Sequence, residues 1–439
     1  MLETLRNAWK VTDLRKKILF TLFIIIIYRI GGTIPVPFLD QAALASWFET
    51  STAEKANFFS YLNILSGGNF SKATLLALSI SPYINAQIII QLLTYALPPL
   101  ENLAKEGEEG RKKIGKITRY VTVLLGLIQG GAYYWWLSAS KIVTYTDGFY
   151  GVFAAATIIL TFTAGTALMM WLGEQINQKG IGNGISIILF AGIVARIPYM
   201  FTGLYNFFML GVNGQTQYLI LVPLYVIISL VIVWLIVFMN EAERRIPIQY
   251  AKRVVGRKMY GGQSSHLPIK VGLSGVMPII FASSILSIPS TIEFFIGEKN
   301  ITGFWRSFFD AFSMGGWLYI ALEFLLILGF AYFYVAIQYN PVEMANNLRQ
   351  NNGTIPGIRP GKPTVDFIAK VLSKITLIGA LFLAIIALVP LLYSKLTGLN
   401  TSSLMMGGTS VIILVGVALE TLKQLESQMM MRHYKGFLD

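Results

Sequence analysis

The sequence predicts an all-α polytopic membrane protein, and three observations lead to that fold class. Of its 439 residues, 54% are hydrophobic and only 13% carry charge, whereas a soluble domain carries charge on about a quarter of its residues. The apolar residues gather into long runs, and the basic residues gather in loops between those runs. This composition excludes a soluble enzyme, a disordered chain and a fibrous repeat.

Ten segments are long and apolar enough to be transmembrane helices. A helix needs about 20 mainly apolar residues to cross a hydrocarbon core of about 30 Å. The segments are residues 18–34, 74–97, 117–139, 152–172, 181–201, 218–239, 271–295, 317–337, 370–392 and 408–426. Because the number is even, both termini are expected on the same side of the membrane.

The positions of lysine and arginine set the orientation, since cytoplasmic loops carry the excess of these residues. Most of the 35 lie on the side that bears both termini, before the first segment and in every second loop after it. The opposite side holds only Lys55, Lys72, Lys141, Lys299, Arg306 and Lys395. We therefore expect both termini in the cytoplasm.

Two shorter segments do not cross the membrane. Residues 1–17 place Leu2, Leu5, Trp9 and Leu14 among polar residues, which is typical of a helix lying in the membrane interface. Residues 57–69 are mainly apolar, contain a glycine pair (Gly67 and Gly68) near their end and lie on the extracytoplasmic side. They form either an interfacial helix or a re-entrant half-helix, and re-entry requires that other helices or water shield the backbone.

No catalytic, metal or cofactor site is predicted. The chain has no cysteine and two histidines, His266 and His433, both in cytoplasmic segments. The stretch Gly110–Lys116 fits the first part of a phosphate-binding loop, but Ile117 stands where a serine or threonine would hold magnesium. Enzymatic activity is therefore poorly supported.

An internal repeat relates the two groups of five segments, as in many transport proteins. The second and seventh segments share a pattern that starts at Pro82 and Pro278. The fifth and tenth share one that starts at Gly184 and Gly408. The repeat predicts two inverted five-helix halves and singles out these four helices.

The aliphatic residues of these motifs allow two interpretations. Pairs four residues apart, such as Ile84 and Ile88 or Ile185 and Leu189, lie on one helix face. They are either ordinary packing residues or a hydrophobic constriction that stops ions by dewetting. An ion-coupled carrier would need charges near the midplane, where Glu323 is the one credible candidate.

Nine motifs in a fixed order relate the chain to a known family. They are Tyr28–Pro37, Ser81–Ile84, Glu106–Ile114, Trp171–Ile176, Gly180–Ser186, Tyr250–Arg253, Ser265–Lys270, Pro356–Gly361 and Gly407–Ser410. Along almost its full length the chain resembles the SecY family, the main subunits of bacterial protein-conducting channels. The resemblance implies two halves that close like a clam shell around a central pore.

The resemblance also implies the seal of that pore. Its ring of bulky apolar side chains would consist of Ile84, Ile88, Ile185, Leu189, Ile280 and Ile413. Family members often have isoleucine where this chain has Leu189, which keeps the bulk and the apolarity. Residues 57–69 match the family's plug, with Phe58, Phe59, Tyr61, Leu62, Ile64, Leu65, Gly67 and Gly68 as its candidate residues.

Two further sites follow from the resemblance. A lateral gate between the halves, through which signal sequences reach lipid, would have Gln91, Gln129 and Ser283 as polar candidates. Two cytoplasmic loops would dock the motor ATPase SecA or the ribosome through Lys252, Arg253, Arg257, Lys258 and, for motor coupling, Arg359.

The expected function is a passive channel in the bacterial plasma membrane for unfolded secretory and membrane proteins with signal sequences. SecE and SecG are the implied companion subunits, and no cofactor is implied. An ion-coupled carrier of small solutes is the alternative. The expected organisation is 1–17 interfacial helix, 18–201 first five spans, 202–239 external loop and sixth span, 240–270 docking loop, 271–337 seventh and eighth spans, 338–369 docking loop, 370–426 last two spans and 427–439 tail.

Overall fold

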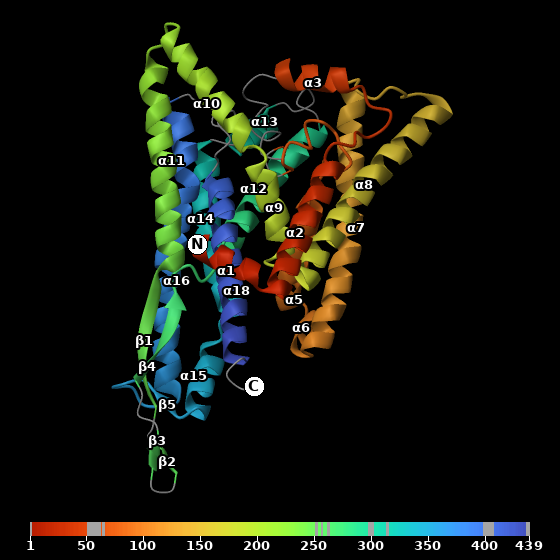
Figure 1. Cartoon of the computed structure of the whole chain (residues 1–439). Helices are drawn as coiled ribbons and strands as arrows, with labels where there is room; N and C mark the ends of the chain where they lie inside the picture. Colours follow the sequence, from red (N-terminus) through yellow and green to blue (C-terminus); the bar gives the residue numbers. More distant parts are fainter. Residues whose placement is uncertain are drawn as a thin grey trace.

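A helix lies at each of the ten predicted segments in the computed structural model, and these helices form one elongated bundle (Figure 1). The structure describes residues 2–50, 63, 66–250, 253–255, 258–260, 264–296, 303–312, 316–397 and 408–435. The ten helices are α2 (Thr12–Gly31), α5 (Ser81–Ala96), α7 (Glu108–Ala139), α8 (Gly148–Lys179), α9 (Gly184–Val194), α11 (Gln217–Glu241), α12 (Met277–Ile296), α14 (Trp317–Gln338), α16 (Lys362–Thr397) and α18 (Gly408–Lys435). We call α2 to α9 the N-terminal half and α11 to α18 the C-terminal half.

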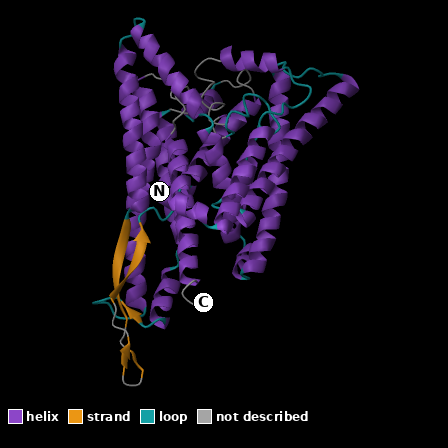
Figure 2. Cartoon of the chain, in the orientation of Figure 1, coloured by secondary structure: helices purple, strands orange, loops and turns teal. Residues whose placement is uncertain are grey.

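Shorter elements cover the two ends of the bundle, and strands occur only at one of them in the described residues (Figure 2). The short helices are α1 (Leu2–Lys10), α3 (Gln41–Thr50), α6 (Pro98–Lys105), α10 (Ile197–Val212), α13 (Phe304–Ala311) and α15 (Pro341–Gln350). The strands are β1 (Glu243–Tyr250), β2 (Arg253–Val255), β3 (Lys258–Tyr260), β4 (Ser264–Lys270) and β5 (Gly353–Thr354).

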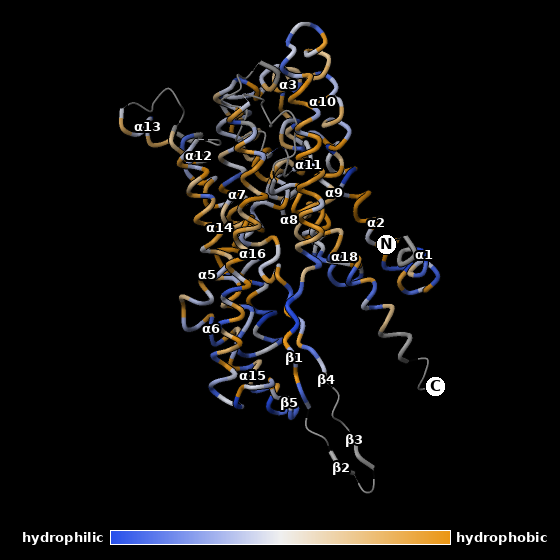
Figure 3. Tube along the Cα trace, turned by 90° about the vertical axis from the view of Figure 1, so that its left-hand side faces the viewer, coloured by the Kyte–Doolittle hydropathy of each residue, from blue (hydrophilic) through white to orange (hydrophobic). Residues whose placement is uncertain are grey.

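Six helical stretches of the described chain are by themselves long and apolar enough to cross a membrane. They are Gly148–Lys179, Gly184–Val212, Gln217–Glu241, Trp317–Gln350, Lys362–Thr397 and Gly408–Met430. Two of the other predicted spans fall short for simple reasons: α2 carries basic residues at both ends, and α5 has 16 residues. Apolar residues fill the bundle, whereas polar residues are frequent along β1 and β4 (Figure 3).

Several helices run past the expected limits, and three predicted spans have helices that start later or end earlier than expected by several residues. The second begins at Ser81 instead of residue 74, and the seventh at Met277 instead of residue 271. Each of these helices has proline at its second position, Pro82 or Pro278, where the missing N–H leaves no hydrogen bond unmade. The fifth ends early, at Val194.

The loops before α12 and α16 contain a sheet that the helical prediction omitted. Strand β1 pairs in antiparallel register with β4 over Glu243–Gln249, and its last two residues pair with β5 from the following loop. In β1, Ile246 and Ile248 are buried while their neighbours are exposed, which is the two-residue alternation of a strand with one covered face. This sheet joins the two predicted docking loops.

Candidate functional site

Five of the six predicted ring residues lie near the first turns of four helices, in a shared apolar cluster. Leu189 and Ile413 are among its buried members, and Ile84, Ile185 and Ile280 are partly buried and pack against it. Two of the contributing helices, α5 and α9, belong to the N-terminal half, while α12 and α18 belong to the C-terminal half. The four helices of the internal repeat therefore meet at one point.

The sixth ring candidate, Ile88, lies elsewhere. It is buried, with 5% of its surface exposed, but it is not part of this cluster. Ile88 lies one turn further along α5 than Ile84, so it faces the same side of the helix at a different depth. The structure thus separates the two residues of the predicted pair.

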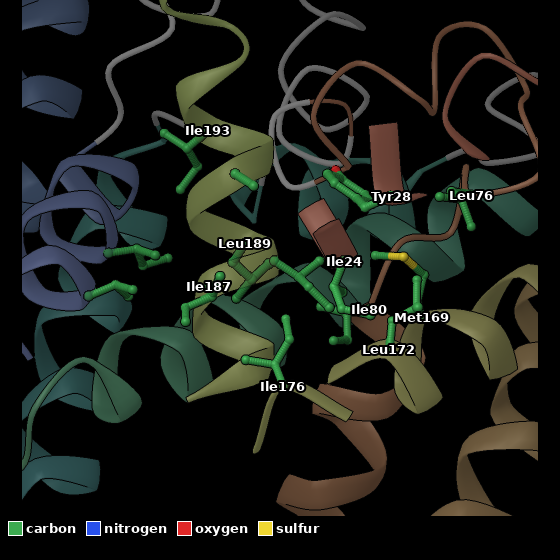
Figure 4. Close-up of a cluster of buried hydrophobic side chains, with 14 residues drawn as sticks. Ile24, Tyr28, Leu76, Ile80, Met169, Leu172, Ile176, Ile187, Leu189 and Ile193 are labelled. Carbon is green, nitrogen blue, oxygen red and sulfur yellow. The ribbon is translucent and has the colours of Figure 1, made fainter. Parts of the chain in front are cut away.

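A second layer of side chains, which the sequence did not single out, supports the cluster. Figure 4 shows Ile24 of α2, Ile80 before α5, and Leu172 and Ile176 of α8 beside Leu189. These residues are nearly or fully buried. The four-residue spacing of Leu172 and Ile176 was the available signal, since it places both on one helix face.

Two glycines at equivalent positions allow the first residues of α9 and α18 to lie close to neighbouring helices. A Cβ atom on Gly184, the first residue of α9, would lie 1.9 Å from the carbonyl oxygen of Gly173 in α8. A Cβ atom on Gly408, the first residue of α18, would lie 2.3 Å from the carbonyl oxygen of Ile386 in α16. Each helix therefore begins against the backbone of the preceding span, a contact that only glycine permits.

A side-chain cap also fixes the start of α9. The Asn183 Oδ1 atom accepts hydrogen bonds from the backbone N–H groups of Ile185, at 3.1 Å, and Ser186, at 3.4 Å. The Asn177 Oδ1 atom accepts one from the Gly184 N–H at 2.8 Å. These bonds satisfy donors that the first turn of a helix leaves free. They hold Ile185 at the edge of the cluster.

The structure describes residues 63 and 66–69 of the predicted plug. Phe58, Phe59, Tyr61, Leu62, Ile64 and Leu65 lie outside the described residues, whereas Gly67 and Gly68 lie inside them. The Tyr28 hydroxyl donates to the Ser66 carbonyl oxygen at 3.2 Å, and the Tyr133 hydroxyl donates to that of Phe70 at 2.7 Å. The end of this segment is therefore attached to α2 and α7.

Gly67 makes the closest contact of that attachment. Its φ angle is +69°, and a Cβ atom there would lie 2.9 Å from the Gly192 Cα atom of α9. The left-handed backbone and the lack of space both favour glycine at this position.

The three predicted gate residues lie on the expected helices, and within the part of the chain that the structure describes none of them bonds to another helix. Gln91 of α5 and Gln129 of α7 are half-buried. Ser283 of α12 is buried, and its hydroxyl donates to the Ile279 carbonyl oxygen of its own helix at 2.8 Å. An aromatic contact that the sequence did not reveal does cross between the halves: the rings of Tyr95 in α5 and Phe333 in α14 are 6.1 Å apart, edge to face.

The predicted docking residues are distributed over the sheet region. Arg253 and Lys258 belong to β2 and β3, Lys252 and Arg257 lie outside the described residues, and Arg359 is exposed in the second loop. The Thr364 hydroxyl donates to the Arg359 carbonyl oxygen at 2.9 Å. This bond fixes the backbone at Arg359 to the start of α16.

Buried charge is scarce near the cluster. Glu323 of α14 has 2% of its surface exposed, and its Oε2 atom has no hydrogen-bond partner. Among the described residues, no three His, Asp or Glu side chains come together as metal ligands would. The arrangement of apolar side chains therefore suits a barrier to water and ions better than a binding site for a cation.

Comparison with known proteins gives a consistent result. Residues 74–422 match the SecY family model. The chain is 43% identical to "Protein translocase subunit SecY" of Streptomyces scabiei and 42% identical to the protein of the same description from Bacillus subtilis (strain 168), in both cases over the full length of both chains.

Solved structures share the fold at low sequence identity. One described as "The structure of a protein conducting channel" has a TM-score of 0.64 and 18% identity, covering 94% of this chain and 92% of its own. Another, "Sec61 in the Canine ribosome-channel complex from the endoplasmic reticulum", has a TM-score of 0.61 and 17% identity over the same shares.

Proposed function

Because the chain belongs to the SecY family of protein translocase subunits, we propose that its central apolar cluster seals the pore through which polypeptides pass. The chain is a subunit of a protein-conducting membrane channel and not an enzyme. The observation that carries the proposal is the meeting of Ile84, Ile185, Leu189, Ile280 and Ile413 from four helices of both halves.

The chemistry of these side chains suits a seal that must also open. Aliphatic groups offer water and ions no hydrogen bonds, so a narrow ring of them stays dry. The same groups make no directed bonds to a passing polypeptide, and they can therefore adapt to any of its side chains without holding it. The ring would close again behind the substrate.

The segment before α5 supplies a second barrier in this proposal. Residues 57–69 would block the external funnel as a plug, with Gly67 and Gly68 at its attached end. The hydrogen bonds of Tyr28 and Tyr133 to Ser66 and Phe70 support this role. They leave the plug with a fixed base on the N-terminal half.

Lateral opening would occur where α5 and α7 face α12 and α14. A signal sequence is apolar, so its transfer from the pore into lipid favours the state in which these helices separate. Its differential affinity for the open state shifts the population toward that state. Gln91, Gln129 and Ser283 line this gate in the proposal, and the Tyr95–Phe333 contact adds an aromatic element.

The cytoplasmic sheet is the proposed docking surface for partners. Lys252, Arg253, Arg257, Lys258 and Arg359 would bind the acidic surface of the motor SecA or ribosomal RNA, because clustered basic side chains release counterions on binding phosphate. SecE and SecG would complete the membrane complex. We place the complex in the bacterial plasma membrane with both termini in the cytoplasm, in agreement with the positions of the basic residues.

A reconstituted translocation assay tests the proposal. The chain is incorporated into proteoliposomes with SecE and SecG, and SecA, ATP and an unfolded precursor are added. We expect the precursor to become protected from added protease only when ATP and an intact signal sequence are both present. Absence of protection with an active motor and correctly oriented subunits would contradict the proposed function.

A further inference from the structure

Helix α13 carries an exposed aromatic surface at the end of the bundle opposite the sheet. It contacts both α12 and α14. Figures 1 and 3 place it at that end, and Figure 3 shows it apart from the main body of the bundle. Phe304 and Trp305, its first two residues, are 77% and 60% exposed. Large apolar side chains that gather on a surface mark a site of interaction.

The aromatic residues of α13 follow a helical period. Phe304 and Phe308 are four residues apart, as are Trp305 and Phe309, so they occupy two adjoining strips along the helix. Arg306 lies outside these strips and is exposed. One aromatic face and one polar face are typical of a helix that lies in a membrane interface.

The rings of this face pack against one another, so the aromatic surface is already formed. The Phe308 ring lies 6.0 Å from the Trp305 ring and 5.5 Å from the Phe309 ring, edge to face in both cases, which is a favoured arrangement of aromatic pairs. Phe309 is buried, with 5% of its surface exposed. Its covered ring gives the face a fixed base, from which the exposed rings of Phe304 and Trp305 extend.

The neighbouring helices place this face at the level of a membrane surface. Helix α12 has 20 residues, which span about 30 Å, and a hydrocarbon core is about as thick. Because α13 lies in the connection from the end of α12 to the start of α14, it lies beside that boundary. Trp317, the first residue of α14, is 63% exposed, and the Lys395 Nζ atom lies 4.6 Å from the centre of its ring. Tryptophan and lysine typically mark the ends of membrane spans.

The short helix α3, at the same end of the bundle, uses its apolar residues differently. Its Leu44 is fully buried, and its Trp47 ring lies 4.7 Å from the Trp136 ring of α7. Helix α3 thus packs against the bundle, whereas α13 leaves Phe304 and Trp305 exposed beside two membrane spans. The surface that covers these two rings is therefore supplied from outside the described part of the chain.

We propose that α13 inserts its aromatic face into the membrane leaflet at this end, at the boundary between lipid headgroups and acyl chains, and holds the ends of α12 and α14 at a fixed depth. Lipid suits this face because aromatic rings bury at that boundary, while the exposed Arg306 can bond to lipid phosphate groups. The inference goes beyond the proposed function, since it concerns how two spans are held in the bilayer and not what passes through the channel.

Spin labels in the cysteine-free chain test the anchor directly. Trp305→Cys places a label on the aromatic face, and Ser307→Cys places one outside it, at another exposed position of α13. The complete channel complex is reconstituted into vesicles of phosphatidylethanolamine and phosphatidylglycerol, and each label is exposed to oxygen, which dissolves in lipid, and to a water-soluble nickel chelate.

The label at position 305 should show a ratio of oxygen to nickel collisions at least about threefold higher than the label at position 307, because only the first lies in lipid. Equal ratios at the two positions would overturn the anchor. A label at position 305 that neither reagent reaches would also overturn it, because a protein surface would then cover the face.

A second measurement keeps the test independent of a label on the aromatic face. With the label at position 307, Phe304→Ser combined with Trp305→Ser removes both exposed rings, and the label should become at least about twofold more mobile as the helix leaves the membrane. Phe149→Ser combined with Tyr150→Ser, a similarly exposed pair at the start of α8, is the matched control. Equal mobility of the label in the two double variants would contradict the anchor. Neither measurement requires a motor or a precursor, so failure here would leave the proposed function intact.

Discussion

The two halves bring equivalent residues to the central cluster, but they are supported differently. In the N-terminal half, the residues that lead into α5 are buried and are attached to α2 and α7 through Tyr28 and Tyr133. In the C-terminal half, the residues that lead into α12 continue directly from β4 of the sheet. One half therefore connects the cluster to the segment that precedes α5, and the other connects it to the sheet.

This difference suggests a division of roles within a repeated architecture. The shared parts, Gly184 and Gly408 with their close backbone contacts, set the positions of the ring helices. The unshared parts differ between the halves. In the proposed function, a plug acts on the ring helices in one half and a docked partner acts on them in the other. Substitutions in shared and unshared parts should consequently have different effects.

The largest effect is expected in the shared part. Gly184→Ala places a Cβ atom 1.9 Å from a backbone oxygen, and Gly408→Ala places one at 2.3 Å, so the backbone must move in either half. We expect a loss of about 3 kcal/mol or more, measured as a lower thermal unfolding midpoint of the purified complex. Gly131→Ala and Gly329→Ala, one in each half with nothing within 4 Å, are the controls, and equal stability of all four variants would refute this explanation.

A smaller effect should follow from loosening the support of the N-terminal half. Tyr133→Phe removes the hydrogen bond to the Phe70 carbonyl oxygen, which then keeps only the bond from the Ala73 N–H. Loss of such a bond costs about 0.5–1.5 kcal/mol. We expect a higher ion leak through resting channels and unchanged binding of SecA. The control is Tyr145→Phe, at a half-exposed position, and a leak that is the same in both variants would argue against the attachment.

The corresponding change in the C-terminal half should have the opposite profile. Arg359→Glu reverses an exposed charge in the docking loop, where it would repel an acidic partner surface. We expect motor-driven export to fall about tenfold or more, equivalent to about 1.4 kcal/mol, with normal assembly and no resting leak. Normal export by this variant would contradict the proposed role of Arg359 in motor coupling.

The smallest effect is expected far from both the Tyr28 and Tyr133 attachment and the sheet that leads into α12. Arg119 of α7 forms an ion pair with Glu174 of α8 at 2.7 Å, with 49% of the Arg119 side chain exposed. Such partly exposed pairs contribute about 0–1 kcal/mol. Arg119→Gln should therefore leave both the resting ion leak and the export rate nearly unchanged. A large change in either would show that this ion pair also affects the ring helices.

The sequence predicted the helical fold because that feature depends on local composition, while the ring remains a prediction that the family resemblance supplied. Runs of apolar residues marked all ten helices, and the motifs at Gly184 and Gly408 identified the helices whose first turns meet. It did not reveal the pairing of β5 with β1, the Tyr95–Phe333 contact or the burial of Ala8 against Leu425. These contacts join distant segments, and no periodicity within one segment encodes them.

The most direct test of the central claim measures ion conductance through resting channels with altered ring residues. Ile413→Asn and Ile280→Asn introduce polar groups into the cluster, whereas Ile413→Leu keeps its bulk and apolarity. If the cluster is the seal, both asparagine variants should leak ions or admit precursors with defective signals, and the leucine variant should stay closed. Unchanged resting conductance and unchanged signal requirement in both asparagine variants would contradict the assignment of the ring.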